Sequence, residues 1–356
     1  MKELSIAVLA GDGIGPEVMA SGLEILSVVE AGLSDVRFSL RHFSVGAGEY
    51  LKNGDPLPPA TLGGAAACDA ILLGAMGLPE VRWPGGLEMT PQIDLREKLD
   101  LYNGVRPIHL YHETHSPLKG YGAGDIDFVI VRENTEGLFS DRLKSRQPDA
   151  DSESDSLRIT RRGAERIARA AFELARKRDG RRKVTLADKA NVLPSMAFFR
   201  NVFDSVAGAF ADVEADHAYI DALAVHLLQR PEQFDVIVTE NMFGDILSDL
   251  CAGLIGGMGL APSADIGDRH AVFQPAHGTA PDIAGQNCAN PVAMVLSVAM
   301  MLDWFDIPET RRAAAAIGQA VAAVLADPAH RTGDLGGSLG TREMTDLITQ
   351  TLSNHL

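Results

Sequence analysis

Two aspartates in the second half of the chain are the residues whose type and spacing first suggest chemistry. Asp245 and Asp249 follow an apolar run at residues 234–238 that predicts a buried strand, and Gly244 predicts a tight turn from that strand into a helix. Four residues apart on a helix, the two carboxylates would share one face, with Cβ atoms roughly 5–6 Å apart. They would repel each other unless a cation lay between them, and Mg²⁺ or Mn²⁺ suits such ligands. The alternative is that Asp245 caps the helix and Asp249 is solvated.

Three arginines lie near predicted element boundaries and could bind an anion. Arg96 lies in a predicted helix at residues 93–102, and Arg106 begins an extended segment. Arg132 ends a predicted strand at residues 127–132. Guanidinium groups can bind carboxylates through two parallel hydrogen bonds. The alternative for each is an ordinary surface arginine.

A lysine follows another predicted strand. Residues 184–187 predict a strand that leads into Lys189, and Asn191 comes two positions later. Asp221 opens a predicted helix after an extended run that starts at residue 215. A lysine flanked by acidic and amide side chains at a strand end is unusual, and the alternative is a paired surface lysine.

Glycine-rich segments near both ends of the chain suggest close approach to a ligand. Residues 11–17 follow a predicted strand at 4–10, but their spacing differs from the dinucleotide fingerprint and Pro16 suits the first turn of a helix. A structural strand-to-helix corner is the alternative there. A second loop of small residues spans 274–285, and a long loop spans 77–90.

The elements that position these residues predict an α/β fold. Predicted strands at 4–10, 36–45 and 70–74 alternate with helices, which indicates a largely parallel sheet. Residues 160–178 predict an amphipathic helix, and 146–156 predict a mobile loop or an arm on another subunit. Three further helices are predicted at residues 291–304, 309–325 and 342–352.

Composition excludes some classes of partner. The formal net charge of −16 argues against nucleic acid and against an anionic membrane surface. The longest apolar run, at residues 291–302, is shorter than the roughly 20 residues that cross a bilayer. Three separated cysteines without CxxC spacing and the lack of a signal peptide predict a cytoplasmic protein.

Seven motifs follow one another along nearly the whole chain. They lie at residues 11–15, 95–107, 131–137, 188–192, 219–222, 241–249 and 277–285 with 290–291. Together they resemble the isocitrate/isopropylmalate dehydrogenase family of β-decarboxylating dehydrogenases. This family includes the isopropylmalate, isocitrate, homoisocitrate and tartrate or D-malate dehydrogenases.

The resemblance implies an α/β fold of two domains with a cleft between them, which is not a Rossmann fold. A cofactor-binding domain would comprise residues 1–102 and 255–356 and carry both termini. Residues 103–254 would form the domain for substrate, metal and dimerisation. The implied assembly is a homodimer with shared active sites.

The resemblance also assigns roles in the oxidative decarboxylation of a 3-substituted malate. Arg96, Arg106 and Arg132 would clamp the carboxylate that leaves as CO₂. Asp245 and Asp249, with the partner's Asp221, would hold Mg²⁺ or Mn²⁺. Lys189, also from the partner subunit, would take the proton of the C2 hydroxyl. Asn191 would help to position the substrate and the nicotinamide.

The implied cofactor is NAD. His277, Gly278, Thr279 and Ala280 would line the adenosine, and Asn290 would lie near the adenine. NAD-dependent members carry Asp and an aliphatic residue where this chain has Asp282 and Ile283, and NADP-dependent members carry Lys and Tyr. A carboxylate accepts hydrogen bonds from the ribose hydroxyls and repels a 2′-phosphate.

One position and one segment depart from the family pattern. Phe139 replaces a tyrosine to which proton delivery after decarboxylation is assigned, and phenylalanine cannot donate a proton. Thr90 and Gln92 fall where isocitrate enzymes place polar groups, although chain length and NAD preference favour an isopropylmalate dehydrogenase-like enzyme. The alternatives are an isocitrate, homoisocitrate, tartrate or D-malate dehydrogenase, a non-catalytic regulatory homologue, and a metal-dependent lyase without net redox chemistry.

Overall fold

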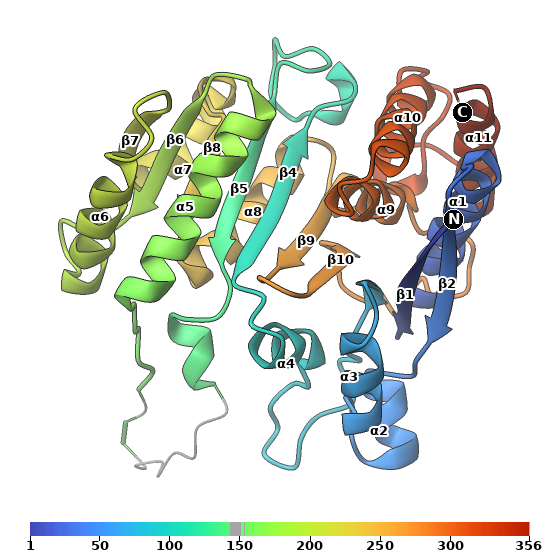
Figure 1. Ribbon diagram of the computed structural model, residues 1–356, viewed down its shortest axis with the longest axis horizontal. Helices are drawn as coiled ribbons and strands as arrows, with labels where there is room; N and C mark the ends of the chain where they lie inside the picture. Colours follow the sequence, from blue (N-terminus) through green and yellow to red (C-terminus); the bar gives the residue numbers. More distant parts are fainter. Residues whose placement is uncertain (143–150, 153, 356) are drawn as a thin grey trace.

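The computed structural model describes residues 1–142, 151–152 and 154–355. Within them one ten-stranded sheet runs across the molecule in the order β2-β1-β3-β10-β9-β4-β5-β8-β6-β7, with helices on both faces (Figure 1). The strands are β1 (Lys2–Gly11), β2 (Val36–His42), β3 (Ala70–Ala75), β4 (Asn103–His109), β5 (Asp127–Glu133), β6 (Lys183–Asp188), β7 (Glu214–Tyr219), β8 (Val236–Thr239), β9 (Pro262–Ile266) and β10 (Ala271–Pro275).

The predicted α/β class is confirmed, but the expectation of a largely parallel sheet holds only at its two ends. β2, β1, β3 and β10 are parallel at one end, and β5, β8, β6 and β7 are parallel at the other. At the centre β9 is antiparallel to both β10 and β4, and β4 is antiparallel to β5. The physical reason is that β9 and β10 are joined by a short turn at residues 267–270, whereas parallel neighbours need a crossover connection.

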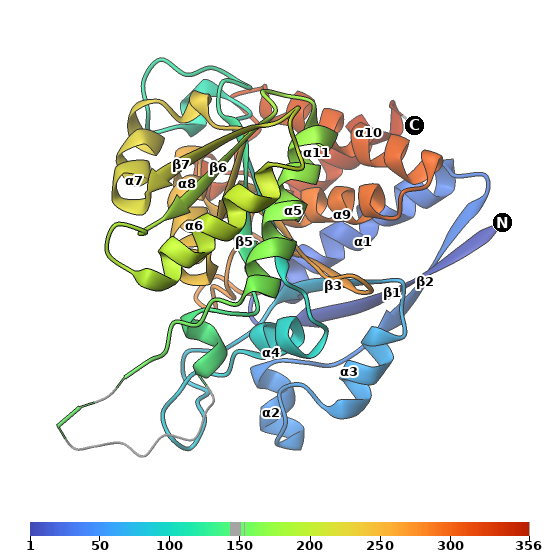
Figure 2. The same ribbon diagram turned by 60° about the vertical axis from the view of Figure 1, so that its left-hand side comes forward.

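Helices cover the sheet in separate groups (Figures 1 and 2). Around β1, β3 and β10 one layer contains α1 (Gly15–Gly32), α9 (Val292–Trp304), α10 (Pro308–Leu325) and α11 (Thr341–Ser353). Around β5, β6 and β8 lie α5 (Arg161–Arg178), α6 (Pro194–Ala207), α7 (Ile220–Gln229) and α8 (Asn241–Leu254). The shorter helices are α2 (Ala47–Asn53), α3 (Pro59–Ala66), α4 (Pro91–Lys98) and the 3₁₀ turns η1 (Glu113–His115), η2 (Leu138–Asp141), η3 (Pro231–Gln233), η4 (Met258–Leu260) and η5 (Gly333–Leu335).

The core follows from the apolar pattern of these elements. All six residues of β3 are buried, as expected for a strand covered on both faces. Helix α9 is apolar around most of its circumference because it contacts β9 and β10 on one side and α1 and α10 on the other. None of the helices in the described ranges has the length and apolar composition that crossing a membrane requires.

Most predicted elements lie within a few residues of their expected positions, with two exceptions. The helix that carries Arg96 ends at Lys98 rather than near residue 102, because Asp100 adopts a left-handed backbone. Gly244 lies inside α8 rather than in a turn, since α8 already begins at Asn241. Most of the acidic stretch at 146–156 lies outside the described residues. The division into segments 1–102 with 255–356 and 103–254 stays a prediction.

Candidate active site

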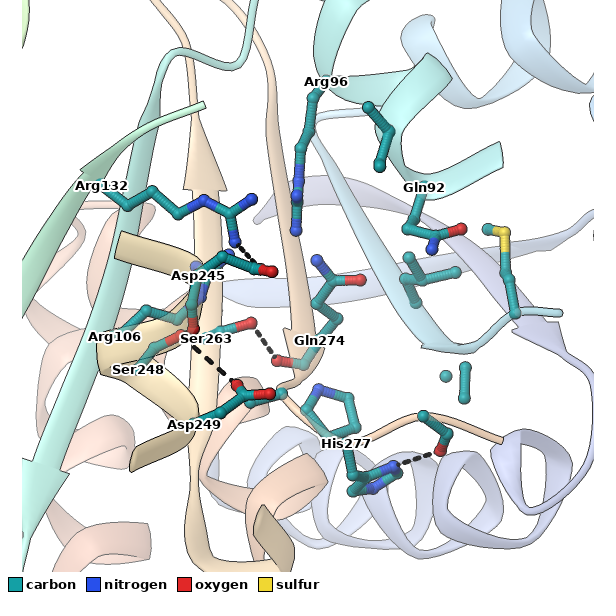
Figure 3. Close-up of a pocket in the computed structure, with 18 of the residues that line it drawn as sticks. Gln92, Arg96, Arg106, Arg132, Asp245, Ser248, Asp249, Ser263, Gln274 and His277 are labelled. Carbon is teal, nitrogen blue, oxygen red and sulfur yellow. Dashed lines mark hydrogen bonds and ion pairs between the residues drawn. The ribbon is translucent and has the colours of Figure 1, made fainter. Parts of the chain in front are cut away.

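A cavity of ≈ 320 Å³ opens beside the centre of the sheet, where α4, α8 and the strands β3, β4, β5 and β10 meet (Figure 3). The three predicted arginines all line it, as do both aspartates of α8. Residues that are far apart in the sequence therefore share one small polar site. The charged lining residues are Arg96, Arg106, Arg132, Asp245 and Asp249.

The three arginines are buried, so none of them is an ordinary surface residue. Arg96 from α4 is 9% exposed, Arg106 from β4 is 4% exposed and Arg132 from β5 is 2% exposed. Arg132 donates from Nε and Nη2 to Oδ1 of Asn241 at 3.0 and 2.7 Å and forms an ion pair with Asp245. Burial, and then the neighbouring charge of Arg96, lower the pKa of Arg132 to about 10, so its side chain stays charged at neutral pH.

Helix α8 places the two aspartates on one face toward the cavity (Figure 3). The capping alternative for Asp245 is wrong, because Glu240 caps this helix by accepting from the backbone N–H groups of Met242 and Phe243. Gly244 is needed for close approach, since a Cβ there would lie 2.6 Å from Cγ of Arg132. The backbone of α8 and the Arg132 side chain therefore lie in direct contact at the edge of the cavity.

The aspartate pair fits a divalent cation in its chemistry. Partial burial, and then the negative charge of Asp245, raise the pKa of Asp249. A cation between the two carboxylates would remove this repulsion. No group of three or more His, Cys, Asp or Glu side chains gathers into a metal site within the part of the chain that the structure describes. One chain therefore brings two carboxylate residues to this place, and the third predicted ligand, Asp221, lies elsewhere.

Lys189 and Asp221 form a pair outside the cavity. Lys189 follows β6, Asp221 lies in the first turn of α7, and Nζ of Lys189 is 2.8 Å from Oδ1 of Asp221. The hydrogen bond from Lys189 lowers the pKa of Asp221. Asn191 is exposed close by in the sequence, and none of these three residues lines the cavity of its own chain.

The predicted cofactor loop adjoins the cavity through His277 and Gly278. Nδ1 of His277 bonds the carbonyl of Gly278 at 2.9 Å, and its buried Nε2 has no hydrogen-bond partner among the described residues. Burial lowers the pKa of His277, so the neutral ring offers Nε2 as an acceptor for a ligand hydroxyl. This unpaired acceptor beside small residues fits a nucleoside.

The rest of the loop is held by the N-terminal glycine motif. The N–H of Ile14 donates to the carbonyl of Thr279 at 2.8 Å, and Gly13 lies so close that a Cβ would reach 2.1 Å from the same oxygen. Ala280 adopts a positive φ of 36°. The glycine motif therefore acts as the support of the loop, which agrees with the structural-corner alternative.

The remaining predicted cofactor residues lie in different surroundings. Asp282 is exposed and Ile283 is half-buried. Asn290 is buried, donates to Asp334 at 3.1 Å and accepts from the N–H of Val292 at 3.0 Å. The predicted place of Asn290 near an adenine stays a prediction, because its amide is occupied within the protein.

The substrate-recognition positions separate in the structure. Gln92 lines the cavity, whereas Thr90 precedes α4 and does not. Phe139 also lines the cavity, and its ring lies 5.5 Å from the guanidinium carbon of Arg132. Phe139, which replaces the tyrosine of the family pattern, therefore lies directly beside Arg132 of the predicted carboxylate clamp.

Sequence reasoning missed two carboxylates that organise the site. Asp265 on β9 is 1% exposed and bonds both Arg96 and Arg106. Glu17 on α1 accepts from the backbone N–H groups of Gly285 and Ala289 in the cofactor loop. The available signal for Asp265 was a charged residue inside an otherwise uncharged strand, which is unusual unless the charge is paired.

Comparisons with known proteins agree with this geometry. The family model described as isocitrate/isopropylmalate dehydrogenase matches residues 5–348. The 3-isopropylmalate dehydrogenase of Salmonella typhimurium is 42% identical over 98% of both chains, and that of Bacillus cereus is 44% identical over 98% of this chain and 96% of its own.

Solved structures show the same fold. Isocitrate dehydrogenase from Methylococcus capsulatus has a TM-score of 0.87 and 36% identity over 98% of this chain and 99% of its own. A β-decarboxylating dehydrogenase from Thermococcus kodakarensis has a TM-score of 0.81 and 36% identity over 99% of this chain and 96% of its own. On the combined match of sequence and fold, the chain belongs to the isocitrate/isopropylmalate dehydrogenase family.

Proposed function

We propose that the protein is an NAD-dependent 3-isopropylmalate dehydrogenase, which oxidises its substrate at C2 and releases a carboxylate as CO₂. The observation that carries this proposal is the single cavity in which three buried arginines face the Asp245 and Asp249 pair. Guanidinium groups bind the substrate carboxylate, and the aspartates hold a divalent cation. Names of relatives at 42 and 44% identity support the choice of substrate.

The chain's own residues orient the substrate. Arg96 bonds Asp265 through Nε, so its two terminal nitrogens are available to a carboxylate in the cavity. Arg106 is held by the carbonyls of Val105 and Ala264 at 3.1 and 2.9 Å. These arginines are fixed before substrate binds, which reduces the entropy lost on binding.

Two bound groups supply the remaining chemistry. When bound, NAD would supply a hydride acceptor for C2, and Mg²⁺ or Mn²⁺ would supply positive charge for the C2 oxygen. Asp245 and Asp249 would hold the cation together with the partner's Asp221. The partner's Lys189 would take the proton of the C2 hydroxyl.

The proposed homodimer is supported by exposed apolar side chains on the two helices beside Lys189 and Asp221. Val225 and Leu228 on α7 are each 49% exposed, and Ile246 and Leu250 on α8 are 60% and 36% exposed. Helices α7 and α8 contact each other, and exposed apolar side chains on neighbouring helices are typical of an interface. Since α8 also carries Asp245 and Asp249, pairing through this face would bring a partner's α7 toward the cavity.

NAD is the proposed dinucleotide, because exposed Asp282 would accept from ribose hydroxyls and repel the 2′-phosphate of NADP. The proposed location is the cytoplasm, which the three free cysteines support.

One observation favours a second candidate, a tartrate dehydrogenase. Oε1 of Gln92 is buried without a hydrogen-bond partner among the described residues, and Gln92 lines the cavity. A hydroxyl on C3 would satisfy this acceptor, whereas an isopropyl group would leave it unpaired. Against this stand Leu73, Met76 and Ile93, which offer apolar contact in the same cavity.

The test is NADH formation at 340 nm with Mg²⁺ or Mn²⁺ against 3-isopropylmalate, isocitrate, homoisocitrate, D-malate and tartrate, with CO₂ followed in parallel. Equal NADH and CO₂, with the highest kcat/KM for 3-isopropylmalate, is the expected result. Highest kcat/KM for tartrate would establish the second candidate, and highest kcat/KM for D-malate would contradict both candidates. CO₂ without NADH would indicate a lyase, and NAD binding without turnover on any substrate would indicate a regulatory homologue.

A further inference from the structure

One buried carboxylate connects four segments of the active site. Asp265 accepts four hydrogen bonds, each 2.8 Å long, and each of its two oxygens accepts two of them. Arg106 and Asn134 donate to Oδ1, and Arg96 and Gln274 donate to Oδ2. The donors come from α4, β4, the segment after β5, and β10, so a single side chain sets the relative positions of all four.

The bonds of Asp265 decide how its two arginines face the cavity. Arg96 uses Nε for Asp265, and neither of its terminal nitrogens has a partner elsewhere in the described chain. Arg106 uses Nη2 for Asp265 and Nη1 for backbone carbonyls. Arg96 can therefore bind a substrate carboxylate through both of its terminal nitrogens. Arg106 contributes mainly its positive charge to the cavity.

Asp265 is ionised in this arrangement. Burial alone would raise its pKa, but the positive charges of Arg106 and Arg96 and their hydrogen bonds hold the pKa of Asp265 well below the usual range. Its negative charge lies directly behind the cavity wall, because Asp265 is 1% exposed while both arginines line the cavity.

Within one chain the charges around the cavity then balance, and the partner's Lys189–Asp221 ion pair would add no net charge. Positive charge comes from Arg96, Arg106 and Arg132, and negative charge comes from Asp245, Asp249 and Asp265. No other described lining residue is charged at neutral pH. A divalent cation adds two positive charges, which a substrate with two carboxylates neutralises. A third carboxylate would find no unpaired cation, since Gln92 and Ile93 beside Arg96 on α4 are neutral.

We propose that Asp265 is a specificity-determining residue, which cancels one positive charge of the Arg96–Arg106 pair and so restricts the site to malates with two carboxylates. The proposal rests on the proposed function in that the cavity is taken as the malate site. A site restricted in this way accepts the dicarboxylates 3-isopropylmalate, D-malate and tartrate. It disfavours the tricarboxylates isocitrate and homoisocitrate. An uncompensated charge in a site of low dielectric constant is what makes the discrimination strong.

The experiment compares the binding of D-malate and isocitrate by calorimetry, in the presence of Mg²⁺ and at fixed ionic strength. In Asp265→Asn the ratio of isocitrate affinity to D-malate affinity is expected to rise by about tenfold or more, the size of one unit charge across a small site at an effective dielectric constant of about 20. If Asp265 had only a structural role, the substitution would weaken the binding of both ligands by the same factor and leave the ratio of affinities unchanged. That result would overturn the proposal.

Two control variants separate charge from folding. Asp265→Glu keeps the charge and is expected to keep the wild-type ratio even if both affinities fall. Asp235→Asn neutralises another buried carboxylate, which bonds Arg178 at 3.0 Å and does not line the cavity. It is expected to lower stability without changing the ratio. A ratio that rises equally in Asp235→Asn would contradict the local role of Asp265.

If Asp265→Asn does not fold, Gln92→Lys provides the same test from inside the cavity. The added cation is expected to raise the isocitrate to D-malate ratio by a similar factor, and an unchanged ratio would overturn the proposal. These measurements need no turnover and no isopropyl group. Failure of the wild type to oxidise 3-isopropylmalate would therefore contradict the proposed function. The ratio of isocitrate affinity to D-malate affinity tests the role of Asp265 independently.

Discussion

Nζ of Lys189 lies 2.8 Å from Oδ1 of Asp221, and neither residue lines the cavity that contains Asp245 and Asp249. Asp221 has a 67% exposed side chain and Lys189 a 26% exposed one, so the pair faces solvent in one chain. A lysine and a carboxylate held together on the surface are available to a second chain. This relationship supports the proposal that two subunits complete the site.

The first prediction concerns stability without metal. Because a raised pKa means that ionising Asp249 disfavours the folded state, stability is lost as the pH rises from the ordinary carboxyl range through the raised pKa. Asp249→Asn is therefore expected to melt a few degrees above the wild type at pH 7 without divalent cations, with the gap closing in acid. Mg²⁺ is expected to raise the melting temperature of the wild type only.

Asp245→Asn is the matched comparison on the same helix. It removes the ion-pair partner of buried Arg132 and is expected to lower the melting temperature of the metal-free protein. Thermal unfolding with and without chelator measures both variants. A metal-free wild type more stable than Asp249→Asn at pH 7 would show that the two carboxylates do not strain each other.

The second prediction concerns the proton that C3 receives after CO₂ leaves. Phe139 lines the cavity beside Arg132 and has no proton to donate, so the wild type in D₂O is expected to give product labelled without stereochemical preference at C3. Phe139→Tyr places a hydroxyl in the cavity and is expected to make labelling stereospecific. NMR of the promptly reduced product distinguishes the two. Stereospecific labelling by the wild type would reveal another proton donor.

How much of this site the sequence predicts depends on the separation of its residues. Asp245 and Asp249 share one helical turn, so the sequence predicted that they bind a cation. Arg96, Arg106 and Arg132 belong to motifs with local signatures, so the sequence predicted that they bind an anion. Asp265 could not be placed because Arg96, its partner, lies 169 residues away. Only the sheet order, with β9 beside β4, brings them together.

The fold was predictable to a similar degree. Periodicity located most helices and strands, since burial of one face or both determines the pattern. It could not show that β4 and β9 run antiparallel at the centre, because strand direction depends on the connections and on partners distant in sequence. Gly244 was misplaced for a related reason, as its small size serves contact with Arg132 on β5 rather than a turn.

The third prediction concerns the choice of dinucleotide. Asp282→Ala removes the exposed carboxylate that would repel a 2′-phosphate, so the ratio of kcat/KM for NAD to that for NADP is expected to fall by about tenfold or more, equivalent to about 1.4 kcal/mol. Asp346→Ala changes the same charge at an exposed position on α11 and is expected to leave the ratio unaltered. Equal ratios in the two variants would argue against this role of Asp282.

The fourth prediction concerns the support of the cofactor loop. Glu17 accepts from the N–H of Gly285 at 3.1 Å and from that of Ala289 at 3.3 Å, and Glu17→Gln replaces one acceptor oxygen by a donor. KM for NAD is expected to rise by about tenfold, as for the loss of one charge-assisted hydrogen bond of about 1.5 kcal/mol, with little change in KM for the malate. Equal increases in both KM values would indicate general destabilisation instead.

The central claim, that two chains together build an oxidative decarboxylase site, is tested most directly by mixing two inactive variants. Lys189→Ala and Asp245→Asn are each expected to abolish NADH formation from 3-isopropylmalate. In a mixed dimer one site combines Asp245 of the first chain with Lys189 of the second, and both are intact. Random mixing is then expected to restore about a quarter of wild-type activity. Mixed dimers that form, as shown by two affinity tags, yet stay inactive would contradict the shared site.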